Sequence, residues 1–282
     1  MTHVWQKSVG GAPGLTRSDG RSLIPLSQQN TPRLQGRVPC HNLLLDSLPS
    51  AEYARLSPHL ESINVAQGRV LTDSDQWISH VYFPTSALVA LLVHMEDGAA
   101  VETGLVGAEG VVHLPVFWGE ERSSYSAVVL QEGHALRMRV DVFRREVQHT
   151  AELQKSLMGY SSFAFNCAAQ RIACNRLHSL KQRVASWLLG LCDLLGREMF
   201  YATHELVAEL LGMRRAGVTE VVNGFKQDGA LRSGRGRIEI TDLRKLEESA
   251  CECYQFLKGE LDRFRDARAP GVEKQRAVGT RA

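Results

Sequence analysis

The chain has 282 residues, which is enough for two domains. Its 44% hydrophobic and 23% charged residues are ordinary for a globular protein. A formal net charge of +2 excludes a strong overall positive field, so any affinity for nucleic acid must come from a local basic patch. The longest apolar run, 87–93, is far too short to cross a bilayer. Six cysteines without a paired framework favour free thiols in a reducing cytoplasm.

The N-terminal half changes from polar to β-rich. Residues 1–39 are rich in Gly, Ser, Pro, Gln and Arg and carry no hydrophobic signal core, which predicts a disordered arm. Residues 43–63 have helical spacing, interrupted at Pro49. Five β-rich runs follow, with Asp97-Gly98 as a hairpin turn, and they predict a compact β-sandwich or roll within residues 40–150. The runs are 81–83, 88–93, 101–106, 126–130 and 135–138.

Residues 151–178 predict one long helix with two apolar stripes. The first follows alternating four- and three-residue steps, close to a heptad seam. It consists of Leu153, Leu157, Tyr160, Ala164, Cys167, Arg171 and Cys174. The second consists of Met158, Phe165, Ala169 and Ile172. Two apolar faces need two partners, so we expect one face to meet its own β-domain and the first stripe to form a homodimer interface. The alternative is a single core helix buried on two sides.

Residues 203–223 have the pattern of a helix-turn-helix. Thr203 is a good N-cap, a stripe that includes Leu206 and Leu210 repeats at helical spacing, and Gly212 suits the left-handed turn that ends a helix. A second amphipathic helix follows, whose polar side chains are expected to face DNA. The predicted DNA-binding residues are Thr203, Arg214, Arg215, Thr219, Glu220, Asn223, Lys226 and Arg235. The alternative is an ordinary αα-hairpin. Ser179-x-x-Gln182 has capping-box spacing for the helix that precedes this motif.

Residues 229–240 favour the DNA-binding interpretation. They alternate around a Gly-Arg-Gly tip, as a short β-hairpin does. Between Gly212 and Ile240 there are six Lys or Arg residues (214, 215, 226, 232, 235, 237) and three acidic residues (220, 228, 239). Such a surface binds phosphates with release of counterions, so a basic wing beside a basic helix predicts contact with double-stranded DNA.

The chain resembles the Crp/Fnr family of bacterial transcription regulators over roughly residues 43–254. The most specific segments, besides the helix-turn-helix, are VYFPT at 81–85, ETGLVGAEG at 102–110, NRLHS at 175–179 and ACECY at 250–254. The resemblance implies an α+β fold with a cyclic-nucleotide-binding-like β-roll as sensor, a long dimerisation helix and a C-terminal winged helix-turn-helix. It also implies a cytoplasmic homodimer on a near-palindromic site, with RNA polymerase as a candidate further partner. The expected boundaries are 1–39 for the arm, 40–150 for the roll, 151–178 for the long helix, 179–258 for the winged domain and 259–282 for a flexible tail.

The chain departs from the relatives that bind cyclic AMP. Those carry a Gly-Glu pair followed by an Arg and a small neighbour; Arg122-Ser123 matches the second half, but no carboxylate stands at Val111–His113. Loss of the ribose acceptor predicts that cyclic AMP is not the effector. No cofactor is predicted, and the effector is unknown. The polar residues expected near the pocket are Glu109, His113, Arg122 and Ser123.

The recognition helix departs as well. Relatives that read a guanine carry Arg-Glu with a further Arg four residues later, whereas here Ala216 follows Arg215 and Glu220 occupies the last position. Arg215 can still bridge a guanine edge, and Glu220 can accept from cytosine or hold a neighbouring arginine. The expected operator therefore differs from that of the cyclic-AMP relatives.

Two other classes of protein compete with this interpretation. An enzyme is disfavoured, because Ala208 stands where a zinc-protease helix starting at His204 needs its second histidine. A cysteine-based redox or metal-responsive regulator is the alternative function. Cys251 and Cys253 are expected on a C-terminal helix, where positions two apart point to different sides, so no metal site is predicted. Cysteines acting as small buried hydrophobes are the simpler interpretation.

Overall fold

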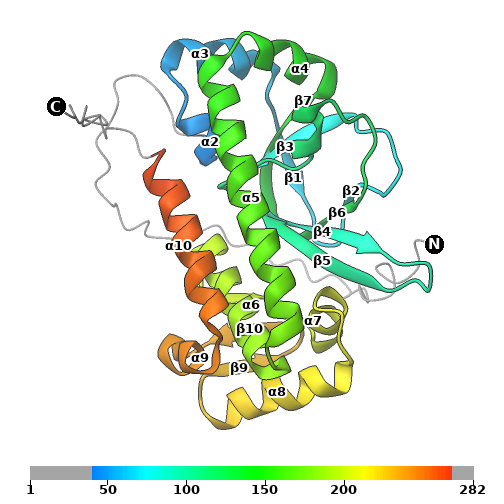
Figure 1. The fold of residues 1–282 in the computed structure, drawn as a ribbon, viewed down its shortest axis with the longest axis vertical. Helices are drawn as coiled ribbons and strands as arrows, with labels where there is room; N and C mark the ends of the chain where they lie inside the picture. The colour runs from blue at the N-terminus through cyan, green and yellow to red at the C-terminus, as the bar shows by residue number, and fades with distance from the viewer. Residues whose placement is uncertain (1–39, 269–282) are drawn as a thin grey trace, which may run out of the picture. The chain divides into compact units, whose positions relative to one another are not determined.

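The computed structural model describes residues 40–268, in which two β-sheets precede a long helix and a smaller helical domain with its own sheet (Figure 1). The predicted arm at 1–39 lies outside the described residues, as do residues 269–282. None of the described helices combines the length and hydropathy that a membrane span requires.

The N-terminal domain is built from two antiparallel sheets. The larger has the order β2-β6-β4-β5, and its strands are β2 (Val70–Thr72), β4 (Leu88–His94), β5 (Ala100–Val106) and β6 (Ser126–Gln131). The smaller has the order β1-β7-β3, and its strands are β1 (Glu61–Val65), β3 (His80–Pro84) and β7 (Gly133–Arg139). Alternate residues of the larger sheet, such as Val89, Val106 and Val129, are buried in a shared apolar cluster. The residues between them, such as Ala90, Val128 and Leu130, are buried as well, so this sheet is covered on both faces.

All five predicted β-runs are strands, and the Asp97-Gly98 hairpin is confirmed. Gly98 has a φ of +87°, and the Asp97 carboxylate accepts a hydrogen bond from the Ala99 amide at 2.9 Å. The prediction of helix through residue 63 is wrong, because β1 pairs with β7 in the register Ile63↔Ala135. The flanking helices are α2 (Leu43–Asp46), α3 (Ser50–Leu56) and α4 (Val140–Gln148), with 3-10 turns at Ser57–His59 and Leu114–Trp118.

The long helix is α5 (Ala151–Leu177), and it connects the two domains. Leu153, Leu157 and Tyr160 are buried in a core cluster that also contains Phe143 and Phe264 of the same chain. Four of the seven residues predicted to form the dimer seam are buried within the protomer and three are half-buried. Much of the first stripe therefore packs within its own chain, and its role as the dimer seam stays a prediction. The second stripe is more open, since its Phe165 is 73% exposed and its Ile172 is 72% exposed.

The C-terminal domain starts at α6, whose first turn is closed by the predicted capping box between Ser179 and Gln182. Its elements are α6 (Leu180–Leu195), β8 (Met199–Tyr201), α7 (His204–Leu210), α8 (Arg215–Gln227), β9 (Leu231–Gly234), β10 (Arg237–Ile240), α9 (Leu243–Ser249) and α10 (Glu252–Asp266). The prediction of a flexible tail from residue 259 is wrong for residues 259–266, because α10 continues through them. Leu261 and Phe264 on α10 are buried, so tertiary packing sustains this part of the helix.

Candidate nucleic-acid interface

The helix-turn-helix consists of α7, a short turn and α8. Thr203 caps α7, since its hydroxyl accepts a hydrogen bond from the Leu206 amide at 3.0 Å. Gly212 takes a φ of +63° in the turn, a conformation that side chains with a Cβ adopt only at a cost. Val218, Val222 and Phe225 form the buried face of α8. The local signals in the sequence thus place the two helices in the expected arrangement.

The outer face of α8 is polar and solvent-accessible. Arg214, Arg215, Glu220, Asn223 and Lys226 are all exposed. Among residues 40–268, no ion pair joins Glu220 to either arginine, so Glu220 is available to an external donor. Arg214 is the residue that precedes α8 and Arg215 begins it. The N-terminal residues of a recognition helix are those that reach base edges in helix-turn-helix proteins.

Thr219 is partly turned toward α7 and is not fully outward. The Thr219 hydroxyl and the His204 imidazole share a hydrogen bond of 3.1 Å, which joins the two helices. Burial lowers the pKa of His204, and the nearby positive charges of Arg215 and Lys226 lower it further. A neutral imidazole at this position avoids adding another cation beneath α8.

Gly217 marks a close contact between α8 and the start of α6. A Cβ at this position would lie 2.7 Å from Cδ2 of Leu180, so any larger residue would force Leu180 to move. This contact cannot be predicted from the sequence, because a glycine inside a helix lowers the local helix propensity and gives no sign of the residue it packs against. At Gly224 a Cβ would meet no atom within 4 Å, so packing within the described residues does not explain that glycine.

The predicted wing is the hairpin of β9 and β10. Gly234 pairs with Arg237, which leaves Arg235 and Gly236 as a two-residue loop. Both have positive φ, +50° and +78°, as the tight hairpin turn that matches strand twist requires. Arg235 is exposed at the tip. The geometry therefore presents a cation beside α8, where a phosphate backbone could be contacted.

The four polar residues predicted near an effector pocket do not converge on one site. Arg122 is exposed and bonds Asp75, while the Ser123 hydroxyl donates to the Tyr125 carbonyl at 2.6 Å. His113 is fully buried, and its Nδ1 is 3.0 Å from the His80 carbonyl oxygen. Glu109 is buried elsewhere and accepts from the Gly107 amide at 2.9 Å, with its second oxygen unpartnered among the described residues. Burial raises the pKa of Glu109.

A cavity of about 330 Å³ lies instead between the sensor domain, α5 and the C-terminal helices. Of the four predicted residues, only Glu109 lines it. At its edge, the buried carboxylate of Glu102 forms an ion pair with Arg171 and accepts from the Trp187 indole at 2.6 Å. Sequence reasoning missed Glu102 and Trp187, because no local pattern shows that residues 85 positions apart meet.

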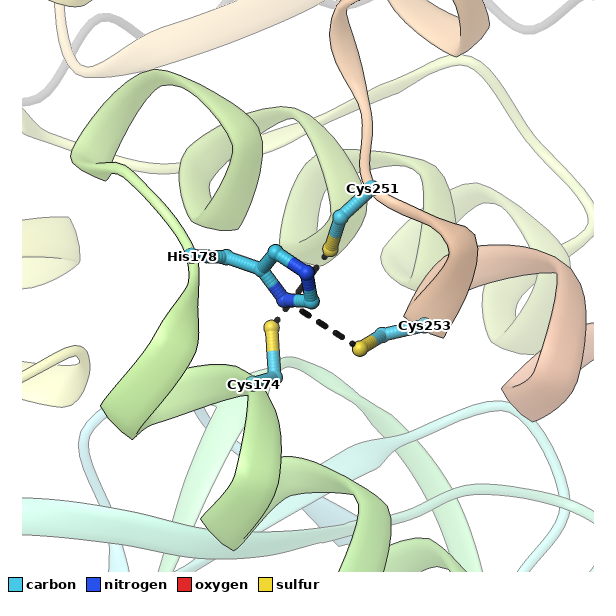
Figure 2. Close-up of side chains that lie close together, drawn as sticks. All are labelled: Cys174, His178, Cys251 and Cys253. Atoms are coloured by element: carbon cyan, nitrogen blue, oxygen red, sulfur yellow. Dashed lines mark hydrogen bonds between the residues drawn. The ribbon is translucent and has the colours of Figure 1, made fainter.

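The structure also brings together a group that the sequence placed on separate faces. Side chains of Cys174, His178, Cys251 and Cys253 converge, and one donor atom from each lies within 4.8 Å of all the others (Figure 2). The prediction that Cys251 and Cys253 point to different sides is wrong. Cys251 precedes α10 in extended backbone, with φ −92° and ψ 166°, so the helical spacing rule does not apply to it.

Known proteins show the same architecture. A family model described as the Crp-like helix-turn-helix domain matches residues 182–249. Transcriptional regulator SdrP of Thermus thermophilus is 29% identical over 175 residues, which are 60% of this chain and 83% of SdrP.

Solved structures extend the similarity beyond the helix-turn-helix. A Crp/Fnr-family transcriptional regulator from Thermus thermophilus is 27% identical, with a TM-score of 0.57 over 67% of this chain and 98% of its own. FixK2 from Bradyrhizobium japonicum has a TM-score of 0.60 over 68% of this chain and 98% of its own. At 14% identity, FixK2 supports the fold alone.

Proposed function

We propose that this chain is a transcription regulator of the Crp/Fnr type that binds a near-palindromic DNA site as a homodimer. It is a transcription regulator with a helix-turn-helix DNA-binding domain, and it is not an enzyme. The observation that carries the proposal is the exposed polar face of α8, with three cations free of ion pairs among residues 40–268 and Arg235 beside them on the wing.

The two ends of α8 would make different contacts with DNA. Arg214 and Arg215 would meet base edges, since they stand at its N-terminus, and a bidentate arginine–guanine contact is the commonest specific one. Glu220 would accept from a cytosine amino group. Lys226, near the other end, and Arg235 on the wing would contact phosphates, which fix orientation without reading sequence.

The homodimer would form through the uncovered stripe of α5. Met158, Phe165 and Ile172 are spaced by seven residues and are 62%, 73% and 72% exposed. Seven-residue spacing of apolar side chains keeps one face of a helix toward a partner helix. A twofold pairing of α5 would also set the two copies of α8 at the symmetric spacing that a palindrome requires.

We propose further that cyclic AMP is not the effector. Arg122, the residue that the motif resemblance matches to the phosphate-binding arginine of the cyclic-AMP relatives, is exposed and forms an ion pair with Asp75. Its guanidinium also lies 4.8 Å from the Trp77 ring centroid. Calorimetry with cyclic AMP, combined with operator binding in its presence, tests this point. Micromolar binding with a tenfold gain in DNA affinity would contradict it.

Selection from a randomised DNA library tests the DNA-binding proposal. Arg215→Ala is expected to cost about 1–3 kcal/mol and to relax the preference at one base pair of each half-site. Lys226→Ala is expected to weaken binding to all sequences and to make the salt dependence of binding shallower, by about 0.9 in slope for each phosphate that is no longer neutralised. Arg139→Ala is the matched control, because Arg139 is an exposed arginine of the sensor domain that pairs with Asp141. Equal selectivity of wild type and Arg215→Ala would overturn the assignment of α8.

A further inference from the structure

We infer that Cys174, His178, Cys251 and Cys253 form a binding site for one zinc ion in each chain. The site is distinct from the DNA-contacting face and from the predicted effector residues. Three buried thiols and one imidazole from separate segments converge within 4.8 Å. Three sulfurs and one nitrogen are a donor set that structural zinc sites use.

The separations between donors fit a tetrahedral ion. With Zn–S of about 2.3 Å and Zn–N of about 2.0 Å, tetrahedral geometry places two sulfurs about 3.8 Å apart and a sulfur and a nitrogen about 3.5 Å apart. The sulfurs of Cys174 and Cys251 are 3.5 Å apart, and Cys253 Sγ is 3.4 Å from Nδ1 of His178. Small side-chain rotations would therefore bring all four donors onto one ion.

The same distances disfavour the other uses of clustered cysteines. A disulfide has sulfurs about 2.05 Å apart and would leave the third thiol and the imidazole without a role. The ligands of an iron–sulfur cluster are divided among two or more iron atoms, so the whole set spans a wider space than the four donors here. One mononuclear ion is the arrangement that uses every member of the group.

Local structure explains why the donors converge. Cys174 lies in the last turn of α5 and His178 is the residue that ends this helix. Cys251 and Cys253 stand at the start of α10, one before the helix and one in its first turn. The two segments are more than seventy residues apart in sequence, and the contacts between α5 and α10 hold them together.

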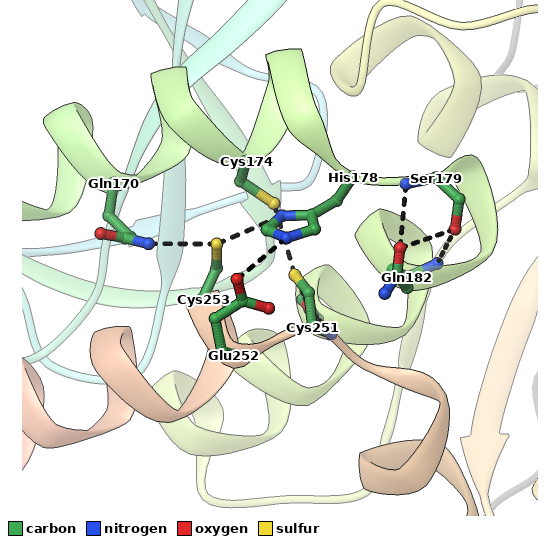
Figure 3. A network of polar contacts seen from close by, with 9 residues as sticks. Gln170, Cys174, His178, Ser179, Gln182, Cys251, Glu252 and Cys253 are labelled. Atoms are coloured by element: carbon green, nitrogen blue, oxygen red, sulfur yellow. Dashed lines mark hydrogen bonds and ion pairs between the residues drawn. The ribbon is translucent and has the colours of Figure 1, made fainter.

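A second layer of polar groups orients the donors (Figure 3). The carboxylate of Glu252 lies 3.1 Å from Nε2 of His178, so it favours a proton on Nε2 and leaves Nδ1 as the ligand atom. The Gln170 amide donates to Cys253 Sγ at 3.1 Å, and the Ser186 hydroxyl lies 3.2 Å from Cys251 Sγ. Carboxylate–histidine pairs and donors to thiolates are typical outer partners of metal ligands.

Zinc here would fix the hinge between the two domains, which is the junction of α5 and α6 at His178 and Ser179. His178 ends α5 and the adjacent Ser179 caps α6, so the ion would tie the hinge to α10. Binding would release the three thiol protons to solvent as the thiolates coordinate the ion. A fixed hinge would set the orientation of α8 relative to α5. This last consequence, but not the site, rests on the proposed DNA-binding function.

The test measures zinc directly in the full-length chain, purified under reducing conditions without chelator. Elemental analysis and native mass spectrometry should find one zinc per chain. Cys174→Ser, Cys251→Ser and Cys253→Ser should each lose it. Cys167→Ser and Cys192→Ser should keep it, because these half-buried cysteines lie outside the cluster. Glu252→Gln should bind zinc roughly 10–100-fold more weakly, as expected for loss of an outer partner.

Chelator-treated wild type provides a measurement that does not depend on whether a variant folds. Back-titration with Co²⁺ should produce the visible absorption of tetrahedral cobalt bound to thiolates, and Zn²⁺ should abolish it. A wild-type chain that neither contains nor takes up zinc would overturn the site. Bound iron in its place, a Cys174–Cys251 disulfide in non-reducing peptide maps, or equal zinc loss from Cys192→Ser would do so too.

Operator binding by the zinc-free chain separates the two proposals. Weaker binding that Zn²⁺ restores supports the role of the hinge. Unchanged binding overturns that role while leaving the DNA-binding function in place. A zinc-loaded chain that binds no DNA would overturn the proposed function and leave the metal site standing.

Discussion

Gln131 and the backbone of Tyr201 exchange two hydrogen bonds across the domain boundary. The side-chain amide of Gln131 donates to the Tyr201 carbonyl at 2.6 Å, and its carbonyl accepts from the Tyr201 N–H at 2.9 Å. Gln131 ends β6 of the sensor domain and Tyr201 ends β8 of the winged domain. A buried amide thus extends the hydrogen bonding of one sheet to a strand of the other domain.

Removal of this link is expected to loosen β8. Gln131→Leu loses both hydrogen bonds, each worth about 1 kcal/mol, so the Tyr201 amide should lose protection in hydrogen exchange. Gln67→Leu is the matched control, since Gln67 donates to the Leu130 carbonyl within the sensor domain. Unchanged protection of Tyr201 in Gln131→Leu would show that the link does not order β8.

The dimer proposal predicts different results for the two faces of α5. Phe165→Glu should give folded monomers with weak operator binding, because a charge on the exposed stripe would be buried unpaired between subunits. Leu157→Glu should instead destabilise the protomer, since Leu157 is fully buried in its core. Sedimentation and circular dichroism distinguish these results, and Phe165→Leu should remain dimeric. A wild-type chain that sediments as a monomer at micromolar concentration would rule out the interface.

The wing offers a matched pair of glycines. Gly236→Ala is expected to cost about 1–2 kcal/mol, because Gly236 has a φ of +78° and a side chain there is strained. Gly234→Ala should be nearly neutral, since a Cβ there would meet no atom within 4 Å. Gly236→Ala alone should lower both the midpoint temperature of thermal unfolding and the affinity for DNA. Equal effects of the two substitutions would contradict the assigned turn.

His113 predicts a dependence of stability on pH. Burial lowers the pKa of His113 from 6.5 to about 4. The unfolded chain therefore takes up this proton first as the pH falls, so the stability contributed by neutral His113 is complete above pH 6.5 and declines toward pH 4. The loss over this range is about 3 kcal/mol for a shift of this size.

His113→Asn tests this dependence, because asparagine tolerates the left-handed backbone at this position and does not titrate. Urea unfolding at several pH values should show a flatter profile for this variant than for wild type. His59→Asn, a change at an exposed histidine, should follow the wild-type profile. Parallel profiles for wild type and His113→Asn would refute the assignment.

The sequence by itself determined the features that depend on neighbouring residues. The caps at Thr203 and Ser179, the turn at Gly212 and the Gly-Arg-Gly tip of the wing each follow from local backbone preferences. These signals were sufficient for the helix-turn-helix and its wing, because each acts within one or two turns of chain. The order of the domains was expected from the resemblance to the Crp/Fnr family.

Only the tertiary structure decided which side chains are covered and which distant residues come together, because both depend on which surfaces pack against each other. The stripes of α5 are both apolar, and only the folded chain shows that Leu157 is covered while Phe165 is not. Helical spacing separated Cys251 from Cys253, whereas the extended backbone at Cys251 and the position of α5 bring both to Cys174 and His178. Contacts between segments more than seventy residues apart leave no periodic signal in a single sequence, because each segment satisfies its own local pattern whichever partner it meets.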